Sequence, residues 1–439
     1  MKRRQFLSNI AAGSMALGAA PVAWAMGEKQ DGENYGINTK CEPTFTKLAG
    51  ESLKAHRDFH VDDLKNAYIP YWDDTIRIDK KRGGFMPYLK EDGTHVDTIK
   101  RMYYQGRGIW VFSYYYNHFG QDERFLKHAK KSIDFVFKHC RDENGYWISE
   151  VTKEGKYLRP SENIYGDIYL AMGMSEYYEA TGDELMKEAA IETCHKVNER
   201  VTSAEYMHLG GHGAGHEPGT KRLGTWQHFL GALSPIARQT DDHGVKMMAR
   251  MCVRNILERH WRPDLGVAFE HLDDQFQPYS PVSGGSHRHV SGWHSVQAAW
   301  MVMADSLRTG HKHNFMKAME MGRMTLEKCW YDGGAESGLT SISNPEGKPG
   351  APAKDGFHAW HAMDDAMIFC LLAIEHTLAP WAFEWYDKIF KHAYSRKDRM
   401  MREGLLHHPR RLFYAPDIID HMIERNGHVS DFFAGTTSP

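Results

Sequence analysis

An unusual combination of side chains lies between residues 290 and 300, where the sequence reads VSGWHSVQAAW. His294, Gln297 and Trp300 follow one another at intervals of three residues, and Trp293 precedes them. In a helix, this spacing brings the side chains round to broadly one half of the surface. An imidazole, an amide and an indole there either form an unusual core or line a polar pocket. Histidine titrates near neutral pH, so such a pocket could transfer protons.

Five further segments combine charged or aromatic side chains with a helical pattern. They read YYQGRGIWVFS, RPSENIYGDIYLAMG, GTWQHFLGALS, FHAWHAMDDAM and LLHHPRRL. A guanidinium in such a set could stabilise a developing negative charge, and aromatic rings could line a binding pocket. The candidate residues in these segments are Arg107, Arg159, Tyr165, Asp167, His228, Trp360, His361, Asp364, Asp365, His407 and Arg410.

Recurring breaks between the helical patterns indicate how these segments are positioned. Short polar turns centre near residues 120, 182, 241, 310 and 378, which are 59 to 69 residues apart. A period of this length indicates stacked helical pairs. Adding a first and a last helix predicts helices that start near residues 47, 97, 122, 161, 183, 220, 242, 285, 311, 355, 380 and 408. Six hairpins closing into a ring make an all-α (α/α)6 barrel, and an open solenoid is the alternative.

The spacing also places three of the candidate groups at one depth. Arg107, His228 and Asp365 each lie 13 residues before the next turn. In a barrel of this kind alternate helices form the inner ring, and we expect their N-terminal ends to face the mouth of a funnel. A single histidine here is more often a satisfied core or surface group, but agreement between six helices favours a shared site. Between the helical pairs, the loops RDENGYW, RPDLGVAF and YDGGAESG are expected to hold short strands or ligand loops.

The N-terminus is typical of an exported protein. Arg3 and Arg4 precede Phe6, a short apolar stretch follows, and the small-residue pattern Ala23–Ala25 comes next. We therefore expect a twin-arginine signal over residues 1–25, recognition by the export machinery, and a periplasmic or otherwise exported protein. The alternative is a cytoplasmic chain with a basic start. Residues 26–46 are expected to form an extension, and 47–439 a single barrel domain.

The composition excludes several classes of partner. The formal charge of −3 and the lack of a basic stripe argue against nucleic acid. No later segment reaches 18 apolar residues, so no membrane span is expected. We expect a monomer or a homodimer. The cysteines are scattered without zinc-like spacing, which favours free thiols at Cys41, Cys140, Cys194, Cys252, Cys329 and Cys370.

The histidine content leaves a metalloenzyme open as an alternative. There are 27 histidines, and His208, His212 and His216 cluster in HLGGHGAGHEPG, while His287 and His289 lie in GGSHRHVSGWH. The first cluster lies in a glycine-rich loop, where helical ligand geometry does not apply, and HExxH is absent. We therefore expect neither a metal nor another cofactor.

Over essentially the whole mature chain, the sequence resembles the N-acylglucosamine 2-epimerase and cellobiose 2-epimerase superfamily. The resemblance rests on QGRGIWVFS, LAMGMSEYYEATGD, GWHSVQAAW and LHHPRRL. It implies that Arg107 binds the sugar and stabilises the intermediate, and that His294 and His407 are the acid–base residues. It also implies that His228 lines the pocket.

Two positions depart from the family pattern. Gln297 stands where the family usually has glutamate, so a charge that would raise the basicity of His294 is expected to be missing. WHAMDDA replaces a Trp-rich segment ending in Glu-Ala, with Asp365 at the acidic position. Further substrate contacts are expected from Gln297, Trp293, Trp360, Asp365, Tyr165 and Arg410.

The expected function is proton transfer on a reducing sugar through an enediolate, giving a 2-epimer or a ketose. A glycoside hydrolase or lyase on the same barrel is an alternative, since fold alone does not fix function. A hydrolase needs two carboxyl groups, for which Asp167 and either Asp364 or Asp365 are the candidates. A non-catalytic sugar-binding protein is the remaining alternative.

Overall fold

The computed structural model describes residues 45–73, 76–90, 92–161, 164–206, 218–280, 288–351, 357–395 and 406–434, with only the backbone for 357–360 and 395. The expected export signal and nearly all of the expected extension lie outside these residues, so both stay predictions. In the described part, no helix is long and apolar enough to cross a membrane.

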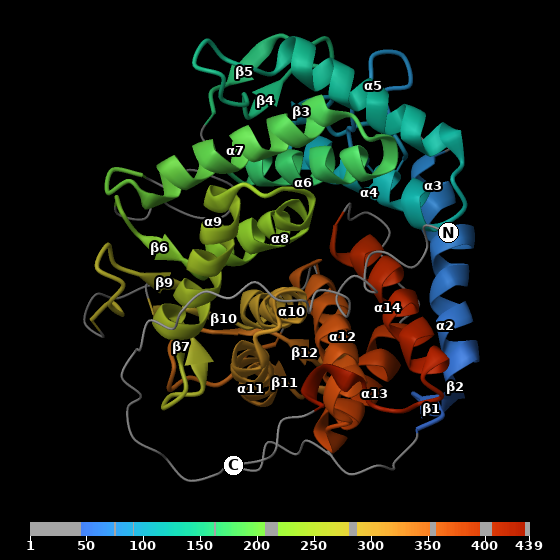
Figure 1. The fold of residues 1–439 in the computed structure, drawn as a ribbon, viewed down its shortest axis with the longest axis vertical. Helices are drawn as coiled ribbons and strands as arrows, with labels where there is room; N and C mark the ends of the chain where they lie inside the picture. The colour runs from blue at the N-terminus through green and yellow to red at the C-terminus, as the bar shows by residue number, and fades with distance from the viewer. Residues whose placement is uncertain are drawn as a thin grey trace.

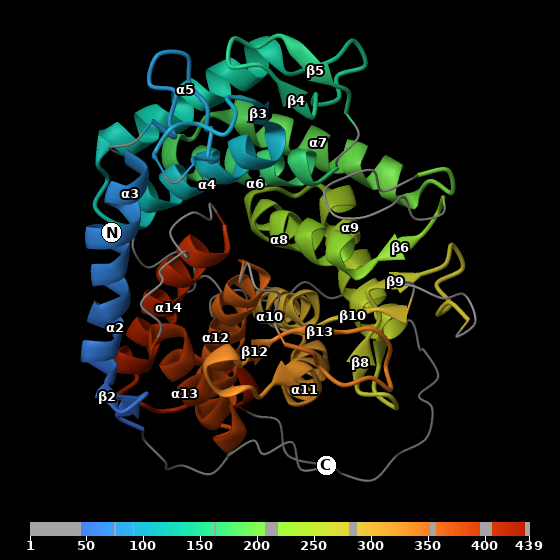
Figure 2. The same ribbon diagram turned by 180° about the vertical axis from the view of Figure 1, so that it is seen from behind.

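In the described residues, six helices form an inner ring, in which each packs against the next along the chain and the last packs against the first (Figures 1 and 2). Their apolar and small residues are buried almost all round, as expected for helices covered on every side. They are α4 (Met102–His118), α6 (Ile164–Thr181), α8 (Leu223–Gln239), α10 (Gly292–Thr309), α12 (Phe357–Thr377) and α14 (His407–Glu424).

An outer layer of helices covers this ring (Figure 1). Helices α5 (Glu123–His139), α7 (Glu184–Thr202), α9 (His243–Arg254), α11 (Lys312–Cys329) and α13 (Pro380–Ser395) each pack on the inner helix that precedes them. Helix α2 (Leu53–Asp62), which continues through a π-helix (Asp63–Tyr68) into α3 (Ile69–Asp73), packs on α14. The two ends of the described chain therefore close the ring, which confirms the (α/α)6 barrel and contradicts the open solenoid.

The turns between paired helices follow from local chemistry. Gly120, Gly182 and Gly310 have positive φ angles, a conformation that glycine adopts without strain. After the turns, the Asp122 and Asp183 carboxylates accept hydrogen bonds from backbone N–H groups and so begin α5 and α7. The expected turn positions are therefore confirmed.

Short antiparallel strands lead into the N-terminal ends of three of the inner helices. Strands β3 (Lys100–Arg101), β6 (Lys221–Arg222) and β10 (Val290–Ser291) run directly into α4, α8 and α10. Their partners are β4 (Glu150–Val151), β9 (His271–Leu272) and β13 (Ser341–Ile342), and β5 (Tyr157–Arg159) extends the first pair. The expected helix start near residue 285 was therefore too early, because 290–291 are extended.

Two further strand pairs confirm that the loops between helical hairpins hold short strands. They are β7 (Trp261–Arg262) with β8 (Val267–Ala268), and β11 (Trp330–Tyr331) with β12 (Gly338–Leu339). At the other end of the domain, β1 (Lys47–Leu48) pairs with β2 (Glu51–Ser52). The expected helix start at 47 was therefore also too early, because a strand pair comes first.

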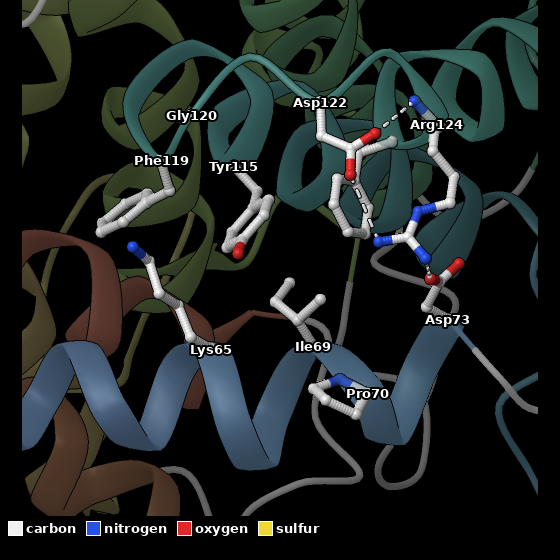
Figure 3. A pocket seen from close by; sticks show the side chains of 10 residues that line it. Lys65, Ile69, Pro70, Asp73, Tyr115, Phe119, Gly120, Asp122 and Arg124 are labelled. Carbon is white, nitrogen blue, oxygen red and sulfur yellow. Dashed lines mark hydrogen bonds and ion pairs between the residues drawn. The ribbon is translucent and has the colours of Figure 1, made fainter.

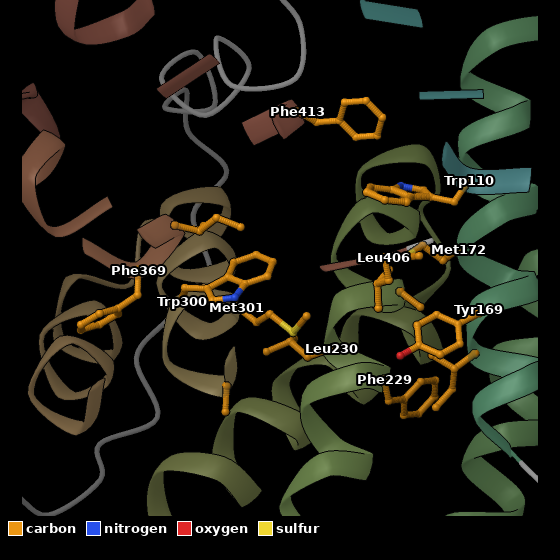
Figure 4. Close-up of a cluster of buried hydrophobic side chains, with 14 of the residues drawn as sticks. Trp110, Tyr169, Met172, Phe229, Leu230, Trp300, Met301, Phe369, Leu406 and Phe413 are labelled. Carbon is orange, nitrogen blue, oxygen red and sulfur yellow. The ribbon is translucent and has the colours of Figure 1, made fainter. Parts of the chain in front are cut away.

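The core fills the space between the inner helices (Figure 4). Trp110, Phe229, Met301 and Phe413 come from four different inner helices and are almost fully buried. Five of the cysteines also lie in the buried interior as free thiols, namely Cys140, Cys194, Cys252, Cys329 and Cys370, while Cys41 lies outside the described residues.

Candidate active site

Polar side chains gather at the N-terminal ends of the inner helices. Arg107, Tyr169, His228 and Gln297 are each the sixth residue of their helix, in α4, α6, α8 and α10 respectively. Their helices are adjacent in the ring, so equal depth brings the groups together. Tyr169 and Gln297 therefore lie at the same depth in the barrel that the sequence predicted for Arg107 and His228.

Arg107 lies between two phenol rings. Its guanidinium carbon is 3.7 Å from the centroid of Tyr103 and 4.2 Å from that of Tyr169. Nη2 donates to both phenolic oxygens, at 2.8 Å in the case of Tyr169. The side chain is almost fully buried, and no carboxylate is recorded in contact with it in the described chain. This fixed positive charge is therefore available to a bound group.

His228 is held in one tautomer by the backbone. Its Nδ1 lies 2.5 Å from the carbonyl oxygen of Gly224, which can only accept, so Nδ1 carries the proton and Nε2 the lone pair. Tyr165 and Tyr169 flank the ring at centroid distances of 4.9 and 5.6 Å. Burial lowers the pKa of His228 well below its usual value, and the charges of His294 and Arg107 lower it further. His228 is therefore neutral near pH 7.

His294 contacts a carboxylate that the sequence pattern did not reveal. Its Nδ1 is 2.8 Å from Oε2 of Glu270, which is buried and comes from the segment between β8 and β9. The expectation that glutamine at position 297 deprives His294 of a neighbouring negative charge is therefore wrong. The carboxylate reaches the imidazole from a different element.

Gln297 instead forms a hydrogen bond with Arg410. With its amide oxygen turned to the guanidinium, Gln297 accepts from Arg410, and its Nε2 donates to Oε1 of Gln227 at 2.9 Å. A neutral amide suits this position because the arginine already has a carboxylate partner. Arg410 Nη2 donates to Oδ1 of Asp365 at 2.5 Å.

Asp365 links three side chains from neighbouring helices. Its Oδ1 also accepts from the indole of Trp300 at 2.9 Å, and its Oδ2 is 2.7 Å from Nδ1 of His407. The imidazole of His361 lies beside His407 at a centroid distance of 4.5 Å. Burial lowers the pKa of His407 well below its usual value, as do the positive charges of Arg410 and Arg107. His407 is thus a neutral base with Nε2 free of these contacts.

These contacts connect all six inner helices. His228 and His294 are 5.8 Å apart at their ring centroids, and the charges of Arg107 and His407 both act on His228. The side chains of His294 and His407 keep 20% and 14% of their surface accessible although they lie within the ring. The arrangement therefore presents two reachable imidazoles, each backed by a buried carboxylate.

Three further candidates from the sequence have different locations. Trp293 lies beside His294, with ring centroids 6.0 Å apart. Arg159 was expected on an inner helix but lies in β5, paired with Glu150 and largely exposed. Trp360 belongs to α12, but its side chain lies outside the described residues.

The carboxylates considered for a hydrolase face away from the site. Asp167 forms an ion pair with Arg200 of α7 at 2.9 Å. The carboxylate of Asp364 accepts a hydrogen bond from Nε of Arg411 at 2.6 Å. Each charge is thus already neutralised by a buried or half-buried arginine. Neither is placed to flank a glycosidic bond with Asp365.

The metal alternative rests on residues that are mostly not described. His208, His212, His216 and His287 lie outside the described residues, and His289 stacks loosely with His271 at 6.4 Å. Within the described ranges, no group of three or more His, Cys, Asp or Glu is arranged to hold a metal ion.

A cavity of about 240 Å³ lies at the opposite end of α4 from Arg107 (Figure 3). It is lined by Lys65 and Ile69 on one side and by Tyr115 and Phe119 on the other. Arg124 closes one wall by forming ion pairs with both Asp73 and Asp122. The cavity therefore contains none of the candidate catalytic groups.

Three residues of the site were missed from the sequence. Tyr169 and Gln297 share the 13-residue offset from the following turn, and only Gln297 was singled out, so the signal for Tyr169 was present. Tyr103 lies one helical turn before Arg107 and could have been found by that spacing. Glu270 carries no periodic signal, because it lies outside the helices.

The fold and the site together define an (α/α)6-barrel enzyme whose polar centre is suited to moving protons. A family model described as N-acylglucosamine 2-epimerase (GlcNAc 2-epimerase) matches residues 83–399, which is more than half of the chain. The chain belongs to this family. It is a carbohydrate epimerase or isomerase, as the resemblance implied.

Similar proteins agree with this assignment. N-acylglucosamine 2-epimerase of Bos taurus is 21% identical over 354 residues, covering 79% of this chain and 82% of the relative. Cellobiose 2-epimerase of Dictyoglomus turgidum is 22% identical over 307 residues, covering 65% and 74%. These names match the superfamily that the sequence motifs resemble.

Solved structures share the fold. Cellobiose 2-epimerase from Spirochaeta thermophila DSM 6192 has a TM-score of 0.69 at 17% identity, covering 84% of this chain and 98% of that protein. A D-mannose isomerase has a TM-score of 0.65 at 14% identity, covering 88% and 100%.

Proposed function

We propose that the chain interconverts reducing sugars by proton transfer between His294, His407 and an open-chain substrate. The observation that carries this proposal is the pair of accessible imidazoles on α10 and α14, each with Nδ1 directed at a buried carboxylate. A carboxylate can only accept, so both Nε2 atoms are left to face a substrate.

The chemistry requires a base, an acid and a fixed positive charge. The proton on the carbon beside the carbonyl is removed by a neutral imidazole, which leaves an enediolate. The guanidinium of Arg107 stabilises the negative oxygen, since it is buried and already oriented by Tyr103 and Tyr169. A proton returned to the opposite face of the same carbon gives the epimer. A proton delivered to the neighbouring carbon on the same face gives the ketose.

His407 is the group we assign to the first proton removal. Burial and the charges of Arg410 and Arg107 lower its pKa, so that it is uncharged near pH 7. His294 belongs to α10, and α12 separates this helix from the α14 helix of His407 in the ring. We assign His294 to the return of the proton in epimerisation.

The relatives supply the sugars to be tested. N-acetylglucosamine, cellobiose and D-mannose represent the sugars named for the similar proteins. The enzyme is incubated with each in D2O, and the position of deuterium in the product is read by NMR. We expect deuterium at C2 of an epimer or at C1 of a ketose.

Two variants and a control test the assigned roles. His294→Asn and His407→Asn are each expected to lower the turnover rate by roughly 10²–10⁴ fold, the range for a general acid or base. His243→Asn, at the exposed start of α9, is the matched control and should leave the rate unchanged. Full activity in both site variants, or no deuterium from any sugar, would refute the proton-transfer assignment.

A further inference from the structure

Glu270 makes a contact whose geometry fixes the tautomer of His294. The 2.8 Å approach of Nδ1 to the carboxylate means that Nδ1 carries a proton, so Nε2 is the nitrogen that exchanges a proton with the substrate. Without this partner the ring could turn or change tautomer, and the nitrogen facing the substrate would then vary.

The backbone of Glu270 is fixed on both sides by the elements that carry the two neighbouring histidines. The N–H of Leu223, the first residue of α8, donates to the Glu270 carbonyl at 2.9 Å. The N–H of Glu270 donates to the carbonyl of His289 at 3.0 Å, just before β10 leads into α10. Glu270 is thus attached to the starts of both helices.

Gly224 provides the space for this pair. A Cβ atom on Gly224 would lie 2.9 Å from Cε1 and 3.1 Å from Nδ1 of His294, and 3.2 Å from Oε1 of Glu270. Since such contacts are tighter than ordinary packing allows, only glycine leaves the imidazole and the carboxylate in place. The carbonyl of the same glycine fixes the tautomer of His228.

The carboxylate of Glu270 is charged despite its burial. Burial disfavours the charge, but His294 and Arg222, whose Nη2 lies 3.7 Å from Oε1, hold the pKa of Glu270 well below its usual value. In the described part of the chain Oε1 has no hydrogen-bond partner, so His294 is the closest donor to this carboxylate. Other titratable or charged groups that face the pair are His228, Tyr165, His260, His271 and His289.

We propose that Glu270 is the positioning residue of His294, with Gly224 as the spacer that lets the two meet. This inference rests on the proposed function, because it assumes that His294 transfers a proton. In the ring, Glu270 has the same relation to His294 as Asp365 has to His407. The Asp365 carboxylate also accepts hydrogen bonds from Trp300 and Arg410. Within the described residues, the Glu270 carboxylate accepts a hydrogen bond from His294 only.

The test compares Glu270→Gln with Glu270→Asp. The amide keeps the shape but loses the charge, so we expect kcat to fall by roughly 10-fold to 10⁴-fold with little change in KM. The basic limb of the pH profile of kcat/KM should move to lower pH, because His294 must carry the proton that it returns and a carboxylate favours the charged imidazole beside it. Asp keeps the charge, so it should retain the wild-type pH profile and part of the kcat.

Glu258→Gln, at an exposed position of the π-helix before β7, is the matched control, and no change is expected. Gly224→Ala is a second probe and should lower kcat while thermal unfolding shows a folded chain. A Glu270→Gln protein with wild-type kcat and pH profile would overturn the inference. So would equal loss in the Asp and Gln proteins with no shift in pH profile, since that result indicates structural support only.

Deuterium incorporation by the wild-type enzyme separates this inference from the proposed function. If the wild type incorporates deuterium and Glu270→Gln is unaffected, only the role of Glu270 is wrong. If the wild type incorporates none, the proposed function itself fails.

Discussion

At the scale of single residues, the site is defined by which nitrogen of each histidine carries the proton. His228, His294 and His407 all direct Nδ1 at an acceptor, which is a backbone carbonyl in the first case and a carboxylate in the other two. Each Nε2 is therefore the nitrogen left to face a bound group. One arginine, Arg107, supplies the charge that an enediolate needs.

The pH dependence of turnover should report the neutral state of His407. Burial and then Arg410 and Arg107 hold the pKa of His407 well below 6.5, so this base loses its function only when the pH falls through that lowered value. We expect the acid limb of kcat/KM to lie clearly below pH 6.5. A limb at or above pH 6.5 in the wild-type profile would contradict the assignment of His407 as the first base.

Arg107 should not tolerate replacement. Arg107→Ala removes the charge and is expected to abolish turnover, while Arg107→Lys keeps a point charge without the planar fork and should retain only a small fraction. The measurement is kcat/KM on the best substrate, with Arg323→Ala on the exposed face of α11 as the control. Near-normal turnover in Arg107→Ala would remove this residue from the site.

Sequence spacing predicted much of the site at this scale, but not the direction of every side chain. Asp365 and His228 were placed correctly by their distance from the next turn. Asp364 is a neighbour of Asp365 yet faces Arg411, since adjacent residues on a helix point about 100° apart. Glu270 could not be predicted, because its approach to His294 depends on strand pairing between segments 50 residues apart in sequence, such as β6 with β9.

At the scale of elements, the site depends on how closely α4 and α6 approach each other. A Cβ atom on Gly106 would lie 2.2 Å from the carbonyl carbon of Tyr169, and one on Gly173 would lie 2.6 Å from the oxygen of Gly106. The two backbones therefore touch, which brings the Tyr169 hydroxyl to 2.8 Å from Arg107. The turn period predicted that these helices are neighbours, but it carries no information on this distance.

Gly106→Ala should therefore separate the two helices. We expect a loss of about 1–3 kcal/mol in the free energy of unfolding, the range for overpacking, together with lower kcat. Gly231→Ala in α8 is the matched control, because its Cβ would meet only the flexible end of Met301. Unfolding in urea measures both. Equal stability of the Gly106 and Gly231 variants would contradict the backbone contact.

At the scale of the whole molecule, a buried polar network joins the first described helix to the last and so holds the ring closed. Nη1 of Arg411 in α14 lies 2.6 Å from Nδ1 of His60 in α2. Because the arginine can only donate, Nδ1 of His60 accepts and the ring proton of His60 lies on Nε2. This Nε2 contacts the hydroxyl of Tyr386 at 3.3 Å. That hydroxyl is 2.6 Å from Nε2 of His56, one turn earlier in α2.

This closure should make the barrel sensitive to acid. Burial and then Arg411 lower the pKa of His56 to about 4, against 6.5 when exposed, and lower that of His60 well below 6.5. Between pH 6.5 and about 4 the unfolded chain binds protons that the folded chain does not, so the free energy of unfolding falls as the pH falls. Each histidine contributes about 1.4 kcal/mol per pH unit.

The contribution of His56 can be isolated by comparing two slopes. Urea unfolding is measured from pH 7 to 4 for the wild type and for His56→Phe, which keeps an aromatic ring against Phe390 but cannot titrate. Other buried groups titrate in this range, including Asp167, whose pKa burial raises to about 7 and whose contribution therefore has the opposite sign. Those groups affect both proteins alike, so the slope of His56→Phe should be smaller by about one proton. An identical slope would show that protonation of His56 does not open the junction between α2 and α13, and acid would then act elsewhere in the ring.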